Sequence, residues 1–128
     1  MMLDFLEEQV FSRFDSKDVF VFGFSQGALV CYELLKILDK PLAGVFPISG
    51  FIADQNKNIK RIHPAQMNTP IVIGHGLNDD IVLFNESELA FQLLNNESTN
   101  VILESYKGGH KIGYSYIKKV KGLIDQIH

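Results

Sequence analysis

Apolar residues recur along the chain with two alternating periods, which predict helices and strands in turn. In residues 3–14 they recur every three or four positions with charged residues between them, as in a helix that lies on a sheet. The apolar positions of this segment are Leu3, Leu6, Val10 and Phe14. Residues 19–22 (Val-Phe-Val-Phe) are instead apolar on both faces, as expected for a strand that helices cover on both sides.

Helical spacing returns in residues 28–38, and the predicted helix ends at Lys40-Pro41. Its apolar side consists of Leu29, Val30, Leu34, Leu35 and Leu38. Further strands are predicted at residues 44–49, 71–74 and 101–104. A helix over residues 85–94 is predicted to start with Asn85 as N-cap and Glu88 as its capping-box partner. A closing amphipathic helix is marked by Ile112, Tyr116, Ile117, Val120 and Ile124.

Strands that alternate with helices at this spacing predict the fold class α/β, with three layers (αβα) around a mostly parallel sheet of about four strands. Two segments depart from this pattern. Pro47 lies inside the second strand, where it cannot donate to a ladder, so we expect a bulge or a shorter strand there. Segment 51–69 is long and polar, and such loops are usually functional or mobile.

Composition narrows the class of protein. The chain has 128 residues, 46% of them hydrophobic, which is enough for one core and predicts a single domain over residues 1–128. The net charge is −3, and the Lys and Arg residues are scattered, so we expect no nucleic-acid partner. Cys31 is the single cysteine, which excludes an internal disulfide and suits a reducing compartment; we therefore expect a cytoplasmic location.

The N-terminal residues argue against export, because acidic side chains stand where a secretory signal has a basic region. The apolar runs are only a few residues long, well short of the roughly 20 that cross a bilayer. We expect no membrane span.

Gly23-Phe24-Ser25-Gln26-Gly27 has the form G-x-S-x-G. A predicted buried strand runs into it and an apolar helix leaves it, which is the strand-turn-helix context of a nucleophile elbow. We expect a strained serine at the strand end, with Gly23 and Gly27 avoiding Cβ clashes where strand and helix nearly touch. The helix N-terminus would favour negative charge on a reacting oxygen. The alternative is a glycine-rich turn with a helix-capping serine.

A serine hydroxyl needs a base and an orienting carboxylate to act as a nucleophile at neutral pH. In α/β-hydrolases these follow the serine in the order acid, then histidine. Residues 75–80 (His-Gly-Leu-Asn-Asp-Asp) follow the third predicted strand, and Gly108-Gly109-His110 follows the fourth. Because the carboxyl ends of parallel strands share one rim of a sheet, these groups are expected beside Ser25.

Three motifs together resemble the phospholipase/carboxylesterase family, which includes acyl-protein thioesterases and bacterial carboxylesterases: Gly-Phe-Ser-Gln-Gly, His75-Gly-x-x-Asp79 followed by Ile81-Val82, and Tyr106-x-x-Gly109-His110. The resemblance runs from about Asp18 to the last residue and corresponds to the C-terminal half of an α/β-hydrolase. It implies Ser25 as nucleophile, Asp79 as acid, His110 as base and the backbone N–H of Gln26 as an oxyanion donor. It also implies an acyl ester or thioester substrate.

The chain departs from the family pattern at several positions. Ala28 replaces a second glycine, and Asp80 replaces a proline, so two adjacent carboxylates compete for the role of acid. The motif register favours Asp79, and whichever is not catalytic is expected to be a solvated turn residue.

A further departure concerns the part of the family that precedes the elbow. Family members begin with several strands and a His-Gly-x-Gly loop that completes the oxyanion hole, and nothing before Ser25 resembles that loop. Losing one oxyanion donor typically costs about 10²–10³ in rate. We therefore expect an open apolar edge at Val19 to Phe22, covered by a second copy or a partner chain. An impaired fragment or one component of a split hydrolase is the alternative to a self-sufficient enzyme.

The remaining candidates are weaker. Phe51, Ile52 and Phe84 are expected to line an acyl pocket. His75 is more simply a packed structural histidine than a second base, and Cys31 is expected in the core. No metal or organic cofactor is implied, because no cluster has zinc spacing and no lysine completes a phosphate loop. A small binding module with an accidental motif would not bring the three implied catalytic side chains together.

Overall fold

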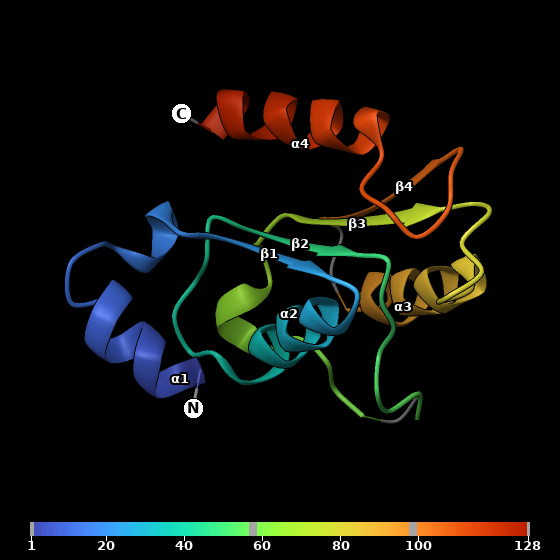
Figure 1. Cartoon of the computed structure of the whole chain (residues 1–128). Helices are drawn as coiled ribbons and strands as arrows, with labels where there is room; N and C mark the ends of the chain where they lie inside the picture. The colour runs from blue at the N-terminus through green and yellow to red at the C-terminus, as the bar shows by residue number, and fades with distance from the viewer. Residues whose placement is uncertain (1, 57–58, 98–99, 128) are drawn as a thin grey trace.

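Four parallel strands lie side by side in the order in which they occur along the chain, and helices cover both faces (Figure 1). The computed structural model describes residues 2–56, 59–97 and 100–127. The strands are β1 (Phe20–Phe24), β2 (Gly44–Ile48), β3 (Ile71–Gly76) and β4 (Val101–Tyr106). The longer helices are α2 (Gln26–Ile37), α3 (Phe84–Asn95) and α4 (Tyr114–Ile127). The predicted α/β fold with a parallel sheet of about four strands is confirmed.

The core consists of two apolar layers, one on each face of the sheet. On the face covered by α2 and α3, the largest cluster joins residues of both helices to the odd-numbered residues of the strands. On the other face, α4 packs through Tyr116 and Val120 against Phe46 and Val72. No helix of the described part of the chain is long and apolar enough to cross a membrane.

β1 is the edge strand, so the prediction that helices bury both of its faces is wrong for part of it. Phe22 is 55% exposed, whereas every residue of β2 and β3 is buried. The predicted open edge at this strand agrees with the sheet order, in which β1 has β2 on one side only among the described residues.

The N-terminal helix is shorter than predicted. Helix α1 (Met2–Phe5) continues as a π-helical turn, η1 (Leu6–Val10), and a 3-10 turn, η2 (Ser16–Asp18), precedes β1. The wider turn, closed by the bond from Phe11 N–H to the Leu6 carbonyl (2.7 Å), lets Phe11 pack against the core. Phe14 therefore falls outside the apolar face and is 61% exposed.

Two further helix predictions are wrong in detail. α3 begins at Phe84 with Leu83 as N-cap, so Asn85 lies inside the first turn and forms no capping box with Glu88. Leu83 takes the cap because its extended backbone accepts the first bond, from Glu86 N–H. In α2 the exposed Val30 is not on the buried face, which includes Cys31 instead.

Pro47 lies within β2 without the expected bulge. The register with β3 is the same on both sides of it, because Val45 pairs with Ile71 and Ile48 pairs with Gly74. The strand ends at Ile48, one residue before the predicted end.

Tyr116 of α4 supplies the hydrogen bond that Pro47 cannot make. The N–H groups two positions before and after Pro47 donate to the carbonyls of Pro70 and Gly74, so by the same alternation the missing N–H would face the Val72 oxygen. The Tyr116 hydroxyl donates to that oxygen at 2.6 Å. A side chain of the covering helix thus satisfies a carbonyl that would otherwise be buried without a partner.

Segment 51–69 is polar but partly tied to the core. Within its described residues, 51–56 and 59–69, the one regular element is a 3-10 turn, η3 (Pro64–Gln66), which His63 caps by accepting the N–H of Ala65. The side chain of Gln66 is fully buried and bonds the carbonyls of Leu38 and Lys40. These bonds anchor the end of this segment against the loop between α2 and β2.

Candidate active site

Ser25 occupies the sharp turn between β1 and α2. Its backbone has φ 58° and ψ −113°, a strained conformation for a residue other than glycine. Its N–H bonds the Ile48 carbonyl at 2.8 Å, which holds the turn against β2. Ser25 is the N-cap of α2 but makes no side-chain capping bond, so the alternative of a capping serine is wrong.

The two glycines of the motif differ. A Cβ on Gly23 would lie 2.2 Å from the Gly27 carbonyl oxygen and 2.7 Å from the Cys31 sulfur, so only glycine fits there. A Cβ on Gly27 would meet nothing within 4 Å, so the prediction that Gly27 avoids a clash is wrong. The close approach of strand and helix depends on Gly23 alone, because Gly27 contributes its backbone to the contact.

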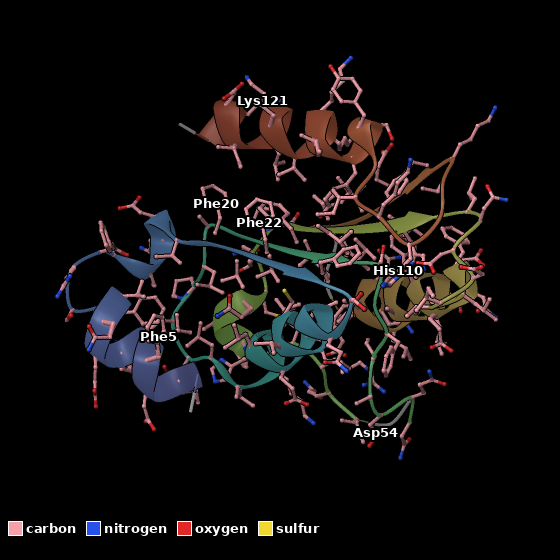
Figure 2. The ribbon with its side chains drawn as sticks, in the orientation of Figure 1. Phe5, Phe20, Phe22, Asp54, His110 and Lys121 are labelled. Carbon is pink, nitrogen blue, oxygen red and sulfur yellow. The ribbon has the colours of Figure 1, made fainter. Side chains whose placement is uncertain are left out.

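His110 lies in the loop between β4 and α4, at the carboxyl end of the sheet (Figure 2). This loop packs tightly on the end of β3: the Gly108 carbonyl accepts the N–H of Asn78 at 2.9 Å, and a Cβ on Gly76 would lie 2.4 Å from the same carbonyl oxygen. The loops that carry His110 and Asp79 are therefore fastened to each other.

Ser25, His110 and Asp79 form one hydrogen-bonded chain. His110 Nε2 lies 3.0 Å from Ser25 Oγ, and His110 Nδ1 lies 2.8 Å from Asp79 Oδ2. An ionised carboxylate can only accept, so Nδ1 carries a hydrogen and the neutral ring presents Nε2 as acceptor to the serine hydroxyl. Three side chains remote in sequence meet at one rim of the sheet, and the accidental-motif hypothesis is wrong.

Asp79 is the carboxylate that faces His110, and Asp80 is exposed. Burial by itself would raise the pKa of Asp79. Hydrogen bonds from His110 and from the N–H groups of Val82 and Ile81, with the charge of His110, outweigh burial and hold the pKa of Asp79 below its usual value. The group stays ionised at neutral pH.

The backbone N–H of Gln26 begins α2, next to the serine. The first N–H groups of a helix have no acceptor within the helix, and its N-terminus favours negative charge. Phe24 flanks the imidazole, with ring centroids 4.9 Å apart. The arrangement can deprotonate Ser25 and receive an oxyanion at one donor.

A groove of about 460 Å³ lies beside this site. Phe51 and Ile52 line it together with Ile81, Val82 and Leu83, which lie in the turn just after Asp79. Phe84 is not part of the lining: its ring packs edge-on against His75, with centroids 5.8 Å apart.

His75 is buried behind Asp79, as predicted for a structural histidine, whereas its buried partner Ser87 was not predicted. His75 Nδ1 contacts Ser87 Oγ at 2.6 Å, and His75 Nε2 contacts the Val82 carbonyl at 2.7 Å. The sequence signal for such a buried pair is a histidine at the end of a buried strand, but no motif points to its partner Ser87, which lies on a helix twelve residues later.

Cys31 lies in the core as predicted, and burial raises the pKa of its thiol to about 12. Among residues 2–56, 59–97 and 100–127, no group of three His, Cys, Asp or Glu side chains is placed to hold a metal ion.

Known proteins similar to the chain are esterases and thioesterases. The sequence profile described as Phospholipase/Carboxylesterase matches residues 1–128. A probable carboxylesterase of Oryza sativa subsp. japonica is 30% identical over 108 residues, which cover 84% of this chain and 41% of the rice protein. Acyl-protein thioesterase 1 of Debaryomyces hansenii is 30% identical over 111 residues, covering 85% of this chain and 48% of that protein.

The fold is also that of solved carboxylesterase structures. The crystal structure of SOBER1 from Arabidopsis thaliana superposes with a TM-score of 0.84 at 24% identity, covering 96% of this chain and 59% of SOBER1. The chain spans about half the length of the curated relatives it matches.

Proposed function

The chain belongs to the phospholipase/carboxylesterase family, and from this premise we propose that it hydrolyses carboxylic esters or thioesters through an acyl-serine intermediate. The observation that carries the proposal is the chain of hydrogen bonds from Ser25 through His110 to Asp79, at 3.0 and 2.8 Å. Ser25, His110 and Asp79 are accordingly assigned as nucleophile, base and acid, and Gln26 as an oxyanion donor.

Acylation begins when Ser25 Oγ attacks the carbonyl carbon and its proton passes to His110 Nε2. The carbonyl oxygen becomes an oxyanion, which the N–H of Gln26 binds. Asp79 stabilises the imidazolium that has formed. The tetrahedral intermediate collapses by breaking the bond from carbon to the leaving oxygen or sulfur, and His110 donates its proton to that alcohol or thiol.

Deacylation repeats the same steps with water. His110 takes a proton from the water as its oxygen attacks the acyl-serine, and then returns the proton to Ser25 Oγ as the acid leaves. We assign the acyl group to the groove lined by Phe51 and Ile52, because that groove adjoins the turn that carries Asp79. Phe84 is assigned no substrate contact.

Turnover on a panel of acyl esters and thioesters of increasing chain length tests this function. We expect hydrolysis that Ser25→Ala abolishes and Ser115→Ala leaves unchanged, since Ser115 is an exposed serine on α4. Equal turnover by the wild type and Ser25→Ala would contradict the assignment.

A second candidate function is that of one component of a divided hydrolase. Its support is strand β1, which has β2 on one side only among the described residues and exposes Phe22. We propose that β1 pairs with a polypeptide equivalent to the part of the family relatives that this chain does not match, and that this polypeptide supplies the second oxyanion donor. A second copy of the chain could pair with β1 but offers no such donor.

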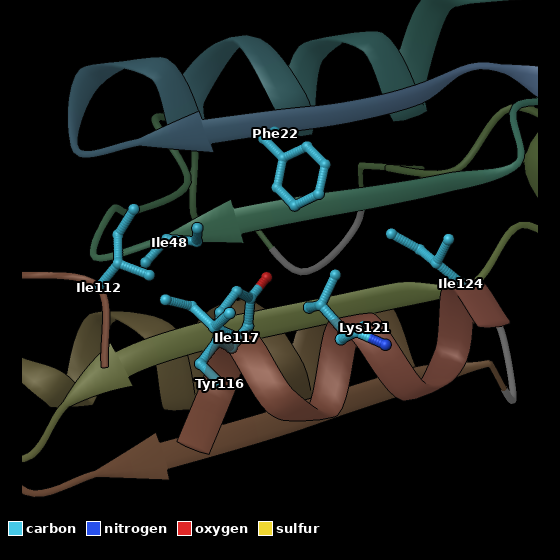
Figure 3. A pocket seen from close by; sticks show the side chains of 8 residues that line it. Phe22, Ile48, Ile112, Tyr116, Ile117, Lys121 and Ile124 are labelled. Atoms are coloured by element: carbon cyan, nitrogen blue, oxygen red, sulfur yellow. The ribbon is translucent and has the colours of Figure 1, made fainter. Parts of the chain in front are cut away.

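The surface proposed for this partner is the edge of β1 and the groove beside it. In strand β1, Phe22 and Phe24 direct their backbone groups away from β2, because the alternate residues Val19 and Ser25 bond toward the β2 side. Phe22, Ile48 and the α4 residues Ile117 and Ile124 enclose an adjoining groove of about 320 Å³ (Figure 3). An apolar groove continuous with an open strand edge suits a strand followed by an apolar helix.

Complementation tests the partner. A polypeptide made from the part of SOBER1 that the chain does not match is added to the purified chain, and turnover is measured. We expect the rate to rise by about 10²–10³, the usual effect of one oxyanion donor. A rate that is unchanged by the complement, or full activity of a dimer of the chain alone, would contradict the partner.

The cytoplasmic location stays a prediction, which cell fractionation can check.

A further inference from the structure

His75 is fully buried behind the proposed catalytic acid, where it can reach no substrate. It stands near the end of β3, and its ring lies between the loop that carries Asp79 and the first turns of α3. The ring contacts both: Nδ1 lies 2.6 Å from Ser87 Oγ on α3, and Nε2 lies 2.7 Å from the Val82 carbonyl. The same Nε2 is 3.3 Å from Asp79 Oδ2.

The partners determine which ring nitrogen carries the hydrogen. The Val82 carbonyl can only accept, so Nε2 must be protonated. In the neutral ring Nδ1 then accepts the hydroxyl hydrogen of Ser87, so both ring nitrogens are paired without a charge on the ring. The Nε2–H group donates to the Val82 oxygen, and Asp79 Oδ2 lies 3.3 Å from the same nitrogen.

These contacts hold the Asp79 carboxylate in one orientation. Asp79 Oδ1 accepts the N–H groups of Ile81 and Val82, both at 2.9 Å. Oδ2 hydrogen-bonds His110 Nδ1 at 2.8 Å and also lies 3.3 Å from His75 Nε2, which is an electrostatic contact. Because His75 also binds the Val82 carbonyl, it fastens both the carboxylate and the turn that donates to it.

We propose that His75 is a positioning residue that keeps Asp79 aimed at His110 Nδ1, a role that rests on the proposed function of that site. The Val82 carbonyl fixes the tautomer that this requires, and Ser87 only pairs the other ring nitrogen. Side chains that orient a metal-binding residue from behind typically change activity by about 10–100-fold when they are removed, and we expect a similar loss for the side chain that orients Asp79.

Two substitutions separate positioning from simple packing. In His75→Gln, the longer amide reaches the place of Nε2 and can donate to Val82 and Asp79. In His75→Asn, the shorter amide reaches only the place of Nδ1 and leaves the Asp79 side without a donor. Ser87→Ala is the matched control, because it removes a buried partner of the ring without touching Asp79.

We expect His75→Asn to lower kcat by about 10–100-fold with little change in KM. The acid limb of its pH–rate profile should move to lower pH, because a displaced Asp79 stabilises the His110 imidazolium less. His75→Gln should retain most of the activity. Ser87→Ala should lower the thermal midpoint without moving the acid limb.

A readout without turnover makes the test independent of the proposed function. The proton on His110 Nδ1, bonded to Asp79, should give a strongly downfield NMR signal in the wild type and in His75→Gln, and the signal should be lost in His75→Asn. An inactive wild type with this pattern would reject the proposed hydrolase and keep the positioning role. The positioning role is overturned if the Nδ1 signal persists in folded His75→Asn, or if His75→Gln and His75→Asn behave alike.

Discussion

Gly23 and Gly27 occupy equivalent places in the motif but have opposite surroundings. A Cβ on Gly23 would overlap the backbone of Gly27, whereas a Cβ on Gly27 would meet open space. We predict that Gly23→Ala destabilises the fold by about 1–3 kcal/mol or more, because β1 and α2 must move apart. Gly27→Ala should instead stabilise it by up to about 1 kcal/mol through helix propensity. Denaturant unfolding of both variants checks this, and similar losses in the two would contradict it.

Asp79 and Asp80 offer a matched pair for the proposed acid. Asp79→Asn can no longer hold the productive tautomer of His110, and we predict a loss of about 10⁴ in kcat. Asp80→Asn removes a carboxylate of the same charge from an exposed position and should leave kcat within a few-fold. Steady-state kinetics decides between them, and a larger loss in Asp80→Asn would reverse the assignment.

The lowered pKa of Asp79 also predicts how the stability of the fold depends on pH. A carboxyl whose folded pKa lies below its unfolded value of about 3.9 stabilises the fold above that value and loses its contribution as pH falls through the folded pKa. The thermal midpoint of Asp79→Asn should therefore lie below that of the wild type at neutral pH, and the gap should close in acid. A gap that is constant down to acid pH would show that the carboxylate contributes nothing.

The sequence predicted the convergence of these three side chains because parallel strands end at a common rim. Ser25, Asp79 and His110 each follow a strand, so their convergence depended only on the element order and the motif register. The role proposed for His75 was not predictable in this way, since it depends on side-chain directions in the turn and on α3. The prediction that Gly27 avoids a clash was wrong because the motif shows that strand and helix approach closely, but not which of the two glycines has a neighbour at its Cβ position.

Pro47 and Tyr116 act as a pair that joins β2, β3 and α4. The Tyr116 hydroxyl donates to the Val72 carbonyl that Pro47 leaves without a strand partner. We predict that Tyr116→Phe lowers the free energy of unfolding by about 1–3 kcal/mol, because this buried carbonyl loses its donor.

The double variant gives the control for this pair. Pro47→Ala restores a backbone N–H opposite Val72, so Tyr116→Phe should cost less in that background than in the wild type. A double-mutant cycle by denaturant unfolding measures the difference. Strictly additive effects would mean that the hydroxyl does not substitute for the missing N–H.

Element boundaries were predicted less well than element types. Helix propensity and spacing extended the first helix to Phe14, but the π-helical turn at Leu6–Val10 redirects the chain, and Phe14 is exposed. Likewise Asn85 has the right chemistry for a cap, yet the extended backbone of Leu83 begins α3 two residues earlier. In both cases tertiary packing, which the local pattern does not contain, decides where the helix starts or stops.

The chain carries the proposed triad on a sheet in which β1, among the described residues, is an edge strand. Phe22 is central to this edge, being 55% exposed and in contact with the ring of Phe46 at a centroid distance of 4.6 Å. We predict that Phe22→Lys abolishes the activation by the complementing polypeptide, because a charge would enter the apolar groove. Phe14→Lys, at an equally exposed phenylalanine outside the groove, should be activated normally. Activation of both variants alike would contradict the docking surface.

Covalent labelling of Ser25 is the most direct measure of the proposed chemistry, since it requires the nucleophile and its base but no release of product. The chain is incubated with a fluorophosphonate, with and without the complementing polypeptide, and the modified peptide is located by mass spectrometry. We predict an adduct on Ser25 that is absent in Ser25→Ala, strongly slowed in a His110→Ala variant, and unchanged in Ser115→Ala. No adduct on Ser25 even with the complement present, or equal labelling of Ser25→Ala, would contradict a serine hydrolase built on this triad.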